Sequence, residues 1–159
     1  MTTVAAPAPA TAGPDAHEPQ SLPAWLLHQA EARGRATAMR VKELGRWHET
    51  SWAHYAERVA GIGRALMHMG VTSGDRVAIL SDNRAEWLMT DLAVQGIGAA
   101  SVALYVTSPA SEVGALLQQA SVEVVIVEDE EQFDKVLEVR DQLSLRTVVV
   151  IDPRGIRRL

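Results

Sequence analysis

The stretch GDRVAILSDNRAEW, from Gly74 to Trp87, contains the pattern that decides the fold. A short apolar segment, residues 77–80, is typical of a buried strand and runs directly into Ser81, Asp82 and Asn83. Such residues cap helices, because a side-chain oxygen accepts a hydrogen bond from a free N–H group of the first helical turn. They also line ligand sites at the carboxyl ends of parallel strands. We favour the helix cap, since capping alone accounts for these residue types.

From Arg76 onward, apolar strands alternate with helical segments. The pattern predicts strands at 77–80, 99–105, 122–127 and 147–151, and helices at 84–97, 109–120 and 130–143. This alternation predicts an α/β fold: a doubly wound, mostly parallel sheet with flanking helices and right-handed crossovers, covered on both faces over its last three strands. Only eight residues follow Ile151, too few for another covering helix. We therefore expect residues 21–159 to form part of a larger sheet domain.

The N-terminal part of the chain has a different character. Residues 1–20 are rich in Ala and Pro, which predicts a disordered tail. A short helix is predicted at Leu22–Arg33, and a hairpin is predicted around Leu44-Gly45. A longer helix follows Thr50 or Ser51 as its cap, and its apolar side chains fall on one face up to Gly70: Tyr55, Val59, Ile62, Leu66 and Met69.

Composition limits the classes of partner. The chain has 159 residues, of which 15 are basic and 20 acidic, so its net charge is -5. We identify no basic stripe, which argues against nucleic acid as a partner. Cysteine is absent, which excludes disulfides and cysteine nucleophiles and is consistent with a reducing cytoplasm. No apolar run approaches the roughly 20 residues of a transmembrane helix.

Several motifs could suggest a binding or catalytic site, but each has a simpler explanation. Three glycine-containing stretches do not fit a phosphate-binding loop: Gly61-Ile-Gly63 lies within a helix, Gly96-Ile-Gly98 precedes a strand, and Asp75 in Thr72–Asp75 would repel a phosphate. The five histidines lack metal-ligand spacing. The acidic run Glu128–Glu131 is typical of a solvated helix start that matches the helix dipole. Ser108 is well placed to cap the helix that begins at Pro109.

Taken in order, five pieces resemble the start of adenylate-forming (AMP-binding) acyl-CoA synthetases, and most closely the long-chain fatty-acid–CoA ligases. The resemblance runs from Leu22 to about Gly155. The five pieces are SWAHYAERV, GDRVAILSDNRAEW, QGIGAASVALYVTSPASE, VVIVEDEEQFDKVLEVRDQL and VVVIDPRG. The resemblance implies an enzyme that uses ATP and magnesium to convert a fatty acid into an acyl-adenylate, and then transfers the acyl group to coenzyme A.

The resemblance also implies what this chain lacks. The family's Thr-Ser-Gly-Thr-Thr-Gly phosphate loop does not occur in the sequence. Its magnesium-binding Glu and catalytic Lys have no counterpart here either. No catalytic, cofactor-binding or metal-binding residue can therefore be assigned, and the chain alone is expected to bind no cofactor and to be inactive. Tyr105, Thr107 and Ser108, at the end of a predicted strand, are the candidates for substrate contact.

The implied partners are the remainder of the ligase, on the same or a separate chain, together with fatty acid and coenzyme A. The family also implies a possible homodimer and a cytoplasmic location, with peripheral binding at the inner membrane surface as an option for the complete enzyme. The alternative is a stand-alone α/β binding or receiver-like signalling module. Asp82 and Asp129 imitate part of a receiver's acidic site, although the expected fifth strand and its lysine are missing.

Overall fold

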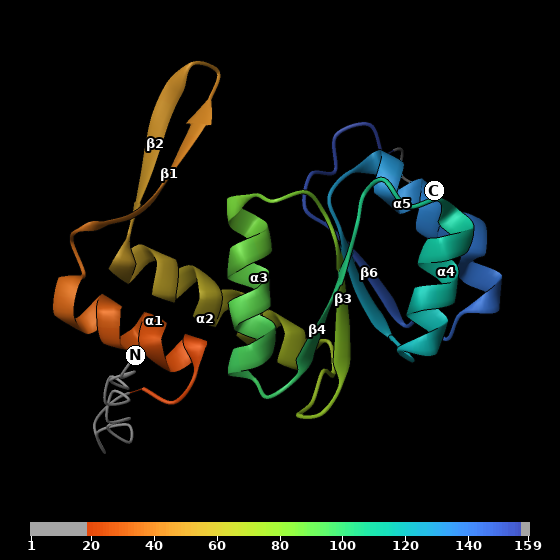
Figure 1. Ribbon diagram of the computed structural model, residues 1–159, viewed down its shortest axis with the longest axis horizontal. Coiled ribbons are helices and arrows are strands. Elements are labelled where there is room, and N and C mark those ends of the chain that lie inside the picture. Colours follow the sequence, from red (N-terminus) through yellow and green to blue (C-terminus); the bar gives the residue numbers. More distant parts are fainter. Residues whose placement is uncertain (1–18, 157–159) are drawn as a thin grey trace, which may run out of the picture.

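The computed structural model describes residues 19–156. Almost all of the predicted N-terminal tail lies outside this range. The described residues form a layered α/β body with a projecting two-stranded hairpin (Figure 1). In chain order the elements are α1 (Leu22–Arg33), β1 (Thr37–Glu43), β2 (Arg46–Ser51), α2 (Trp52–His68), β3 (Arg76–Leu80), α3 (Ala85–Gly96), β4 (Ala100–Leu104), α4 (Ala110–Gln119), β5 (Val124–Val127), α5 (Glu130–Val139), the 3-10 turn η1 (Arg140–Gln142) and β6 (Thr147–Val150).

The central sheet confirms the predicted α/β class. Its strands are all parallel and lie in the order β4-β3-β5-β6. The chain first moves from β3 outward to β4, and then crosses back over β3 to β5 and on to β6. The direction of winding therefore changes between β3 and β5. In open α/β sheets, ligands bind outside the carboxyl ends of the strands at such a change of direction.

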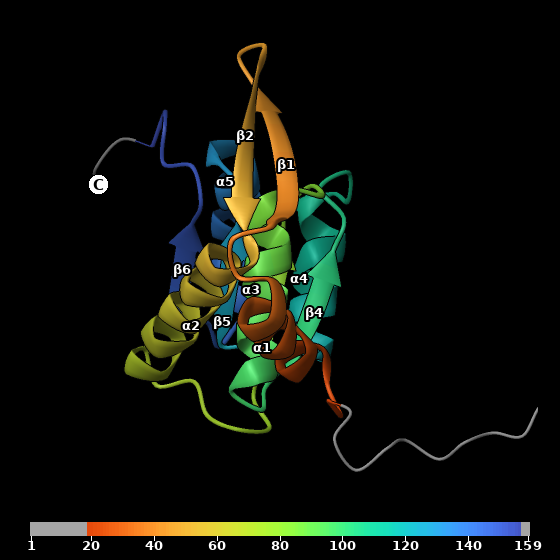
Figure 2. The same ribbon diagram turned by 90° about the vertical axis from the view of Figure 1, so that its left-hand side faces the viewer.

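Helices cover both faces of the sheet (Figures 1 and 2). α2 and α3 pack on one face, where Leu66 and Val94 lie in one cluster with Val77. α4 and α5 pack on the other face, where Val113 and Val136 lie in one cluster with Leu80, Leu104 and Val125. β5 is buried along its whole length, as expected for a central strand. β4 and β6 form the edges of the sheet and are only partly buried.

The N-terminal elements follow the predicted pattern closely. α1 has the predicted bounds, and β1 and β2 pair antiparallel around Leu44-Gly45. Ser51 caps α2, because its Oγ accepts a hydrogen bond from the backbone N–H of His54 at 3.2 Å. A Cβ built on Gly63 would lie 3.3 Å from Cγ2 of Ile97, so this glycine permits close packing of α2 against α3. No helix within residues 19–156 is long and apolar enough to cross a membrane.

Two predicted helix caps are wrong. α3 has Arg84 at its N-cap position, one residue beyond Asn83, and α4 has Pro109 there instead of Ser108. Within the described residues, neither helix receives a side-chain cap hydrogen bond. Ser81 and Asp82 lie too far upstream of α3 to reach its free N–H groups, and another element holds them. The predicted helix 130–143 is divided into α5 and η1.

Candidate functional site

A cleft of about 550 Å³ lies at the carboxyl ends of β3 and β4. The opening stretch contributes Ser81, Asp82, Asn83 and Trp87 to its wall. The loop after β4 contributes the opposite wall, which includes Tyr105 and Thr107, two of the three predicted substrate contacts. Tyr105 is 82% exposed, so its ring is free to meet a ligand. Ser108 is buried and does not line the cleft.

Glu128 connects the ends of the strands next to this cleft. It is the first residue after β5, and its side chain is only 20% exposed. Its carboxylate accepts hydrogen bonds from Oγ of Ser81 at 3.1 Å and from the backbone N–H of Asp82 at 2.6 Å. Glu128 therefore joins the ends of β3 and β5 at the point where the winding changes direction. The prediction of a solvated acidic run was wrong for this residue, because two neighbouring strand ends enclose it.

Arg84 neutralises Glu128. Its Nη1 donates to Oε1 of Glu128 at 3.1 Å, and its Nε donates to Glu86 at 2.8 Å. Partial burial acts to lower the pKa of Arg84, but its hydrogen bonds and charge interactions with the two glutamates raise it overall. Arg84 thus remains cationic. This ion pair links the segments that follow β3 and β5, and the cleft with Tyr105 and Thr107 lies beside β4.

Lys135 stabilises the loop after β4, on the other side of the cleft. From α5, its Nζ donates to the carbonyl oxygen of Val106 at 2.5 Å and to Oε1 of Gln132 at 3.1 Å. It also forms an ion pair with Glu131 at 3.0 Å. These contacts fix the loop that carries Tyr105. The neighbouring hollow of about 400 Å³ is lined by several carboxylates, yet residues 19–156 contain no group of three potential ligands that could hold a metal ion.

The turn Thr72–Asp75 does not fit a nucleotide phosphate. The carboxylate of Asp75 accepts hydrogen bonds from the backbone N–H of Thr72 at 2.7 Å and from its Oγ1 at 3.0 Å. These bonds are the main reason that the pKa of Asp75 lies below its ordinary value. The donors that a phosphate would need are therefore occupied, and an anion stands at the position.

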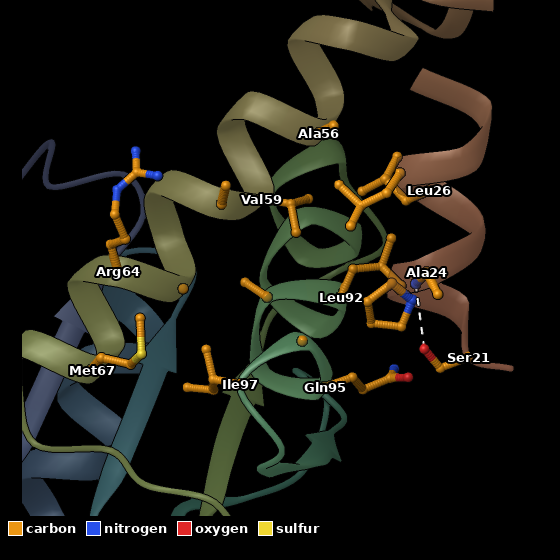
Figure 3. A pocket seen from close by; sticks show the side chains of 16 residues that line it. Ser21, Ala24, Leu26, Ala56, Val59, Arg64, Met67, Leu92, Gln95 and Ile97 are labelled. Carbon is orange, nitrogen blue, oxygen red and sulfur yellow. Dashed lines mark hydrogen bonds between the residues drawn. The ribbon is translucent and has the colours of Figure 1, made fainter. Parts of the chain in front are cut away.

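A second concavity, of about 490 Å³, lies between α1, α2 and α3 (Figure 3). Its wall is mostly apolar, with side chains such as Val59, Leu92 and Ile97. Ser21 is already engaged as the cap of α1, where it accepts a hydrogen bond from the N–H of Ala24 at 3.3 Å. Arg64 lies at the rim, and Figure 3 shows its guanidinium directed away from the other labelled side chains. This arrangement brings no acid, base or nucleophile together, so the groove is not a candidate for chemistry.

The sequence profile of the AMP-binding enzymes matches residues 26–159. The chain belongs to this family. One curated relative is the long-chain-fatty-acid–CoA ligase FadD15 of Mycobacterium bovis, which is 30% identical to this chain over 157 residues. The aligned region covers 98% of this chain and 25% of FadD15. The ligase ACSBG2 of Xenopus laevis is 29% identical over 128 residues, or 77% of the chain and 17% of the relative. The chain thus spans a quarter or less of the length of these relatives.

Solved structures give the same picture of the AMP-binding fold. A putative long-chain-fatty-acid CoA ligase from Rhodopseudomonas palustris is 26% identical, with a TM-score of 0.73 over 82% of this chain and 32% of that one. The anthranilate CoA ligase AuaEII, in complex with anthranoyl-AMP, has a TM-score of 0.73 over 79% of this chain and 24% of its own, at 24% identity. At that identity the second likeness supports the fold alone.

Sequence reasoning missed three residues that shape this site in the AMP-binding chain. They are Glu128, Arg84 and Lys135. Arg84 and Glu128 are hydrogen-bonded to each other across 44 residues of sequence, and Lys135 donates a hydrogen bond to Val106, 29 residues before it. One local signal could have pointed to Glu128: an acidic residue directly follows a central strand at the change of winding. No comparable local signal marks Lys135, whose partner is a backbone carbonyl.

Asp152, which follows β6, offers a pH test of the charges near Arg84. The pKa of Asp152 is lowered to about 2, chiefly because the Arg154 side chain hydrogen-bonds to its carboxylate, with smaller contributions that include the charge of Arg84. Such a carboxyl keeps its charge as the pH falls below its ordinary value of 3.8, and any stability it adds is lost as the pH falls toward 2. We expect Arg154→Ala to raise the pKa of Asp152 toward 3.8, as measured by an NMR titration of the carboxyl carbon. An unchanged pKa would contradict this assignment.

Proposed function

We propose that this chain forms part of the large N-terminal domain of an ATP-dependent long-chain fatty-acid–CoA ligase. The observation that carries the proposal is the similarity to FadD15 along 98% of the chain, within a family match over residues 26–159. The complete enzyme would use ATP and magnesium to form an acyl-adenylate and would then transfer the acyl group to coenzyme A. The remainder of the ligase, on the same or a separate chain, would be the principal partner.

The contribution of this chain is a framework with one wall of a ligand site. The ion pair of Glu128 and Arg84 fixes the strand ends, and Lys135 fixes the loop after β4. Tyr105 and Thr107 are thereby held at the open cleft, where they are our candidates for substrate contact. Because the donors of Thr72 are occupied by Asp75, we infer that other parts of the ligase hold the ATP phosphates. A cytoplasmic enzyme that binds peripherally to membranes, and a homodimer, belong to the same proposal.

Pyrophosphate exchange tests the proposal directly. We expect the 159-residue chain, given ATP, magnesium and palmitate, to incorporate labelled pyrophosphate into ATP only at the background rate. Native material captured from the source cells through an N-terminal epitope should show exchange that depends on fatty acid. The control is the same capture from cells without the epitope. Exchange by the isolated chain would overturn the framework role, and captured material that exchanges with no fatty acid would overturn the ligase assignment.

One observation keeps the receiver-like alternative testable. The strand order β4-β3-β5-β6 is also that of the first four strands of flavodoxin-like proteins. In a receiver, Asp129 would accept the phosphoryl group, but here its carboxylate caps α5 by accepting a hydrogen bond from the N–H of Gln132 at 3.2 Å. Labelling of Asp129 by acetyl phosphate, and its loss in Asp129→Asn, would favour the signalling module over the ligase.

A further inference from the structure

The hairpin of β1 and β2 extends away from the helices that carry it (Figures 1 and 2). At its tip, Leu44 and Gly45 both have positive φ angles, of 46° and 79°. This is the pattern of a two-residue type I′ turn, which matches the twist of the flanking strands. The first position of such a turn favours Asn, Asp or Gly, because other L-residues are strained in the left-handed region. The protein nevertheless has a leucine there.

The side chain of Leu44 is also 99% exposed. Burial therefore does not compensate for the backbone strain. A residue that breaks a local rule without a compensating contact is the kind that marks a functional position. Since both the strain and the exposure would be relieved by asparagine, the leucine is better explained by something outside the described residues that contacts the tip.

Two further exposed apolar residues lie near Leu44 in the hairpin, on its two opposite faces, since Val41 pairs with His48 and Trp47 pairs with Lys42. Trp47 is 64% exposed and Val41 is 42% exposed. Lys42 lies opposite Trp47 in the hairpin, with its ammonium 5.9 Å from the ring centroid. An indole next to a basic group is characteristic of side chains at the boundary between a lipid bilayer and water. We refer to Val41, Leu44 and Trp47 as the apolar tip.

The apolar tip stands in a strongly basic stretch. Residues 33–51, which include the whole hairpin, carry five basic side chains and two acidic ones, Glu43 and Glu49, which is a net charge of +3 in a chain of net charge -5. All five are exposed, although Arg40 also forms an ion pair with Glu49 at 2.8 Å. The five residues are Arg33, Arg35, Arg40, Lys42 and Arg46.

We propose that the β1–β2 hairpin binds an anionic lipid surface, with the apolar tip inserted among the headgroups and the basic residues above it. Basic groups near an anionic leaflet are attracted to it, and exposed apolar side chains gain by leaving water. Nucleic acid would use the same charges but would leave Leu44 and Val41 without a role. The inference rests on the peripheral membrane binding in the proposed function and names the segment that carries it. Lipid binding is measured without the ligase activity, so the two proposals can fail separately.

Sedimentation with vesicles tests the inference on the full chain. We expect binding to phosphatidylcholine vesicles that contain phosphatidylglycerol, weaker binding to phosphatidylcholine alone, and weakening by salt. Leu44→Asn should reduce the partition coefficient by about tenfold or more, because one inserted leucine is lost. The same variant should unfold at a temperature no lower than the wild type, since asparagine tolerates the turn. Loss of binding would then not reflect misfolding.

A matched control and a second readout complete the test. Leu27→Gln replaces another exposed leucine, 56% exposed on α1, and should leave lipid binding unchanged. Vesicles of brominated phosphatidylglycerol should quench tryptophan emission of the wild type far more than that of Trp47→Phe. The proposal is overturned if the chain does not bind anionic vesicles, if Leu44→Asn binds within twofold of the wild type, or if quenching is equal in both proteins. The last two outcomes would place the lipid contact elsewhere on the chain.

Discussion

Replacement of Glu128 by alanine is expected to lower the free energy of unfolding by about 2–4 kcal/mol. The carboxylate accepts hydrogen bonds from Ser81, Asp82 and Arg84, and its side chain is 20% exposed, so solvent screens these contacts only in part. Without it, the partly buried guanidinium of Arg84 would lose one of its two ion pairs and keep the one with Glu86. The largest share of the loss comes from this lost pair and from the freed N–H of Asp82.

Urea unfolding measures the loss, and Glu138→Ala is the matched control. Glu138 is an exposed residue on α5, and a surface change of this kind usually shifts stability by no more than about 0.5 kcal/mol. Hydrogen exchange gives a local readout: the amide of Asp82 should exchange faster in Glu128→Ala than in the wild type. Glu128→Gln should have a smaller effect, since its amide oxygen still accepts a hydrogen bond. Equal stability of the Glu128 and Glu138 variants would show that the ion pair contributes nothing.

The elements of this fold were predictable because their signals are local. Alternation and helical periodicity lie within each segment, so α1 and the hairpin turn at Leu44-Gly45 fall where predicted. The caps failed for a different reason. Ser81 has the right residue type for a cap, but a carboxylate 47 residues later binds its hydroxyl. Tertiary contacts of this kind override local propensity, and a single sequence contains no periodic pattern that reports them.

The candidate site was predictable in position but not in detail. The rule that ligands bind at the carboxyl ends of parallel strands placed Tyr105 and Thr107 on the correct side of the sheet. The rule does not say which side chains after a strand turn outward, and Ser108 points into the body instead. Nor does it show that Glu128 and Arg84 form an ion pair at the ends of β3 and β5. The cleft that contains Tyr105 and Thr107 lies beside β4, where the loop held by Lys135 forms one wall.

Replacement of Gly114 by leucine is the second change for which we expect a large effect, a loss of about 2–3 kcal/mol in the free energy of unfolding. Gly114 is buried in α4, where glycine is a poor helix former. A Cβ at this position would lie 3.1–3.3 Å from three side-chain atoms of Val139. Val139 is itself 5% exposed at the end of α5. The glycine thus matches the close approach of α4 and α5, where even a Cβ would require Val139 to shift by a few tenths of an ångström.

A double-mutant cycle tests this explanation of Gly114. If Val139 is the obstacle, Val139→Ala should relieve part of the overlap by removing its two γ-carbons, so the double variant should be destabilised by at least about 1 kcal/mol less than the sum of the single variants. Ala115→Leu, on the exposed side of the same helix, is the control and should change stability little. Additive effects of the two substitutions would mean that the leucine clashes elsewhere. A coupling of the expected size would show that the contact between α4 and α5, which supports the strand ends on this face, depends on one glycine.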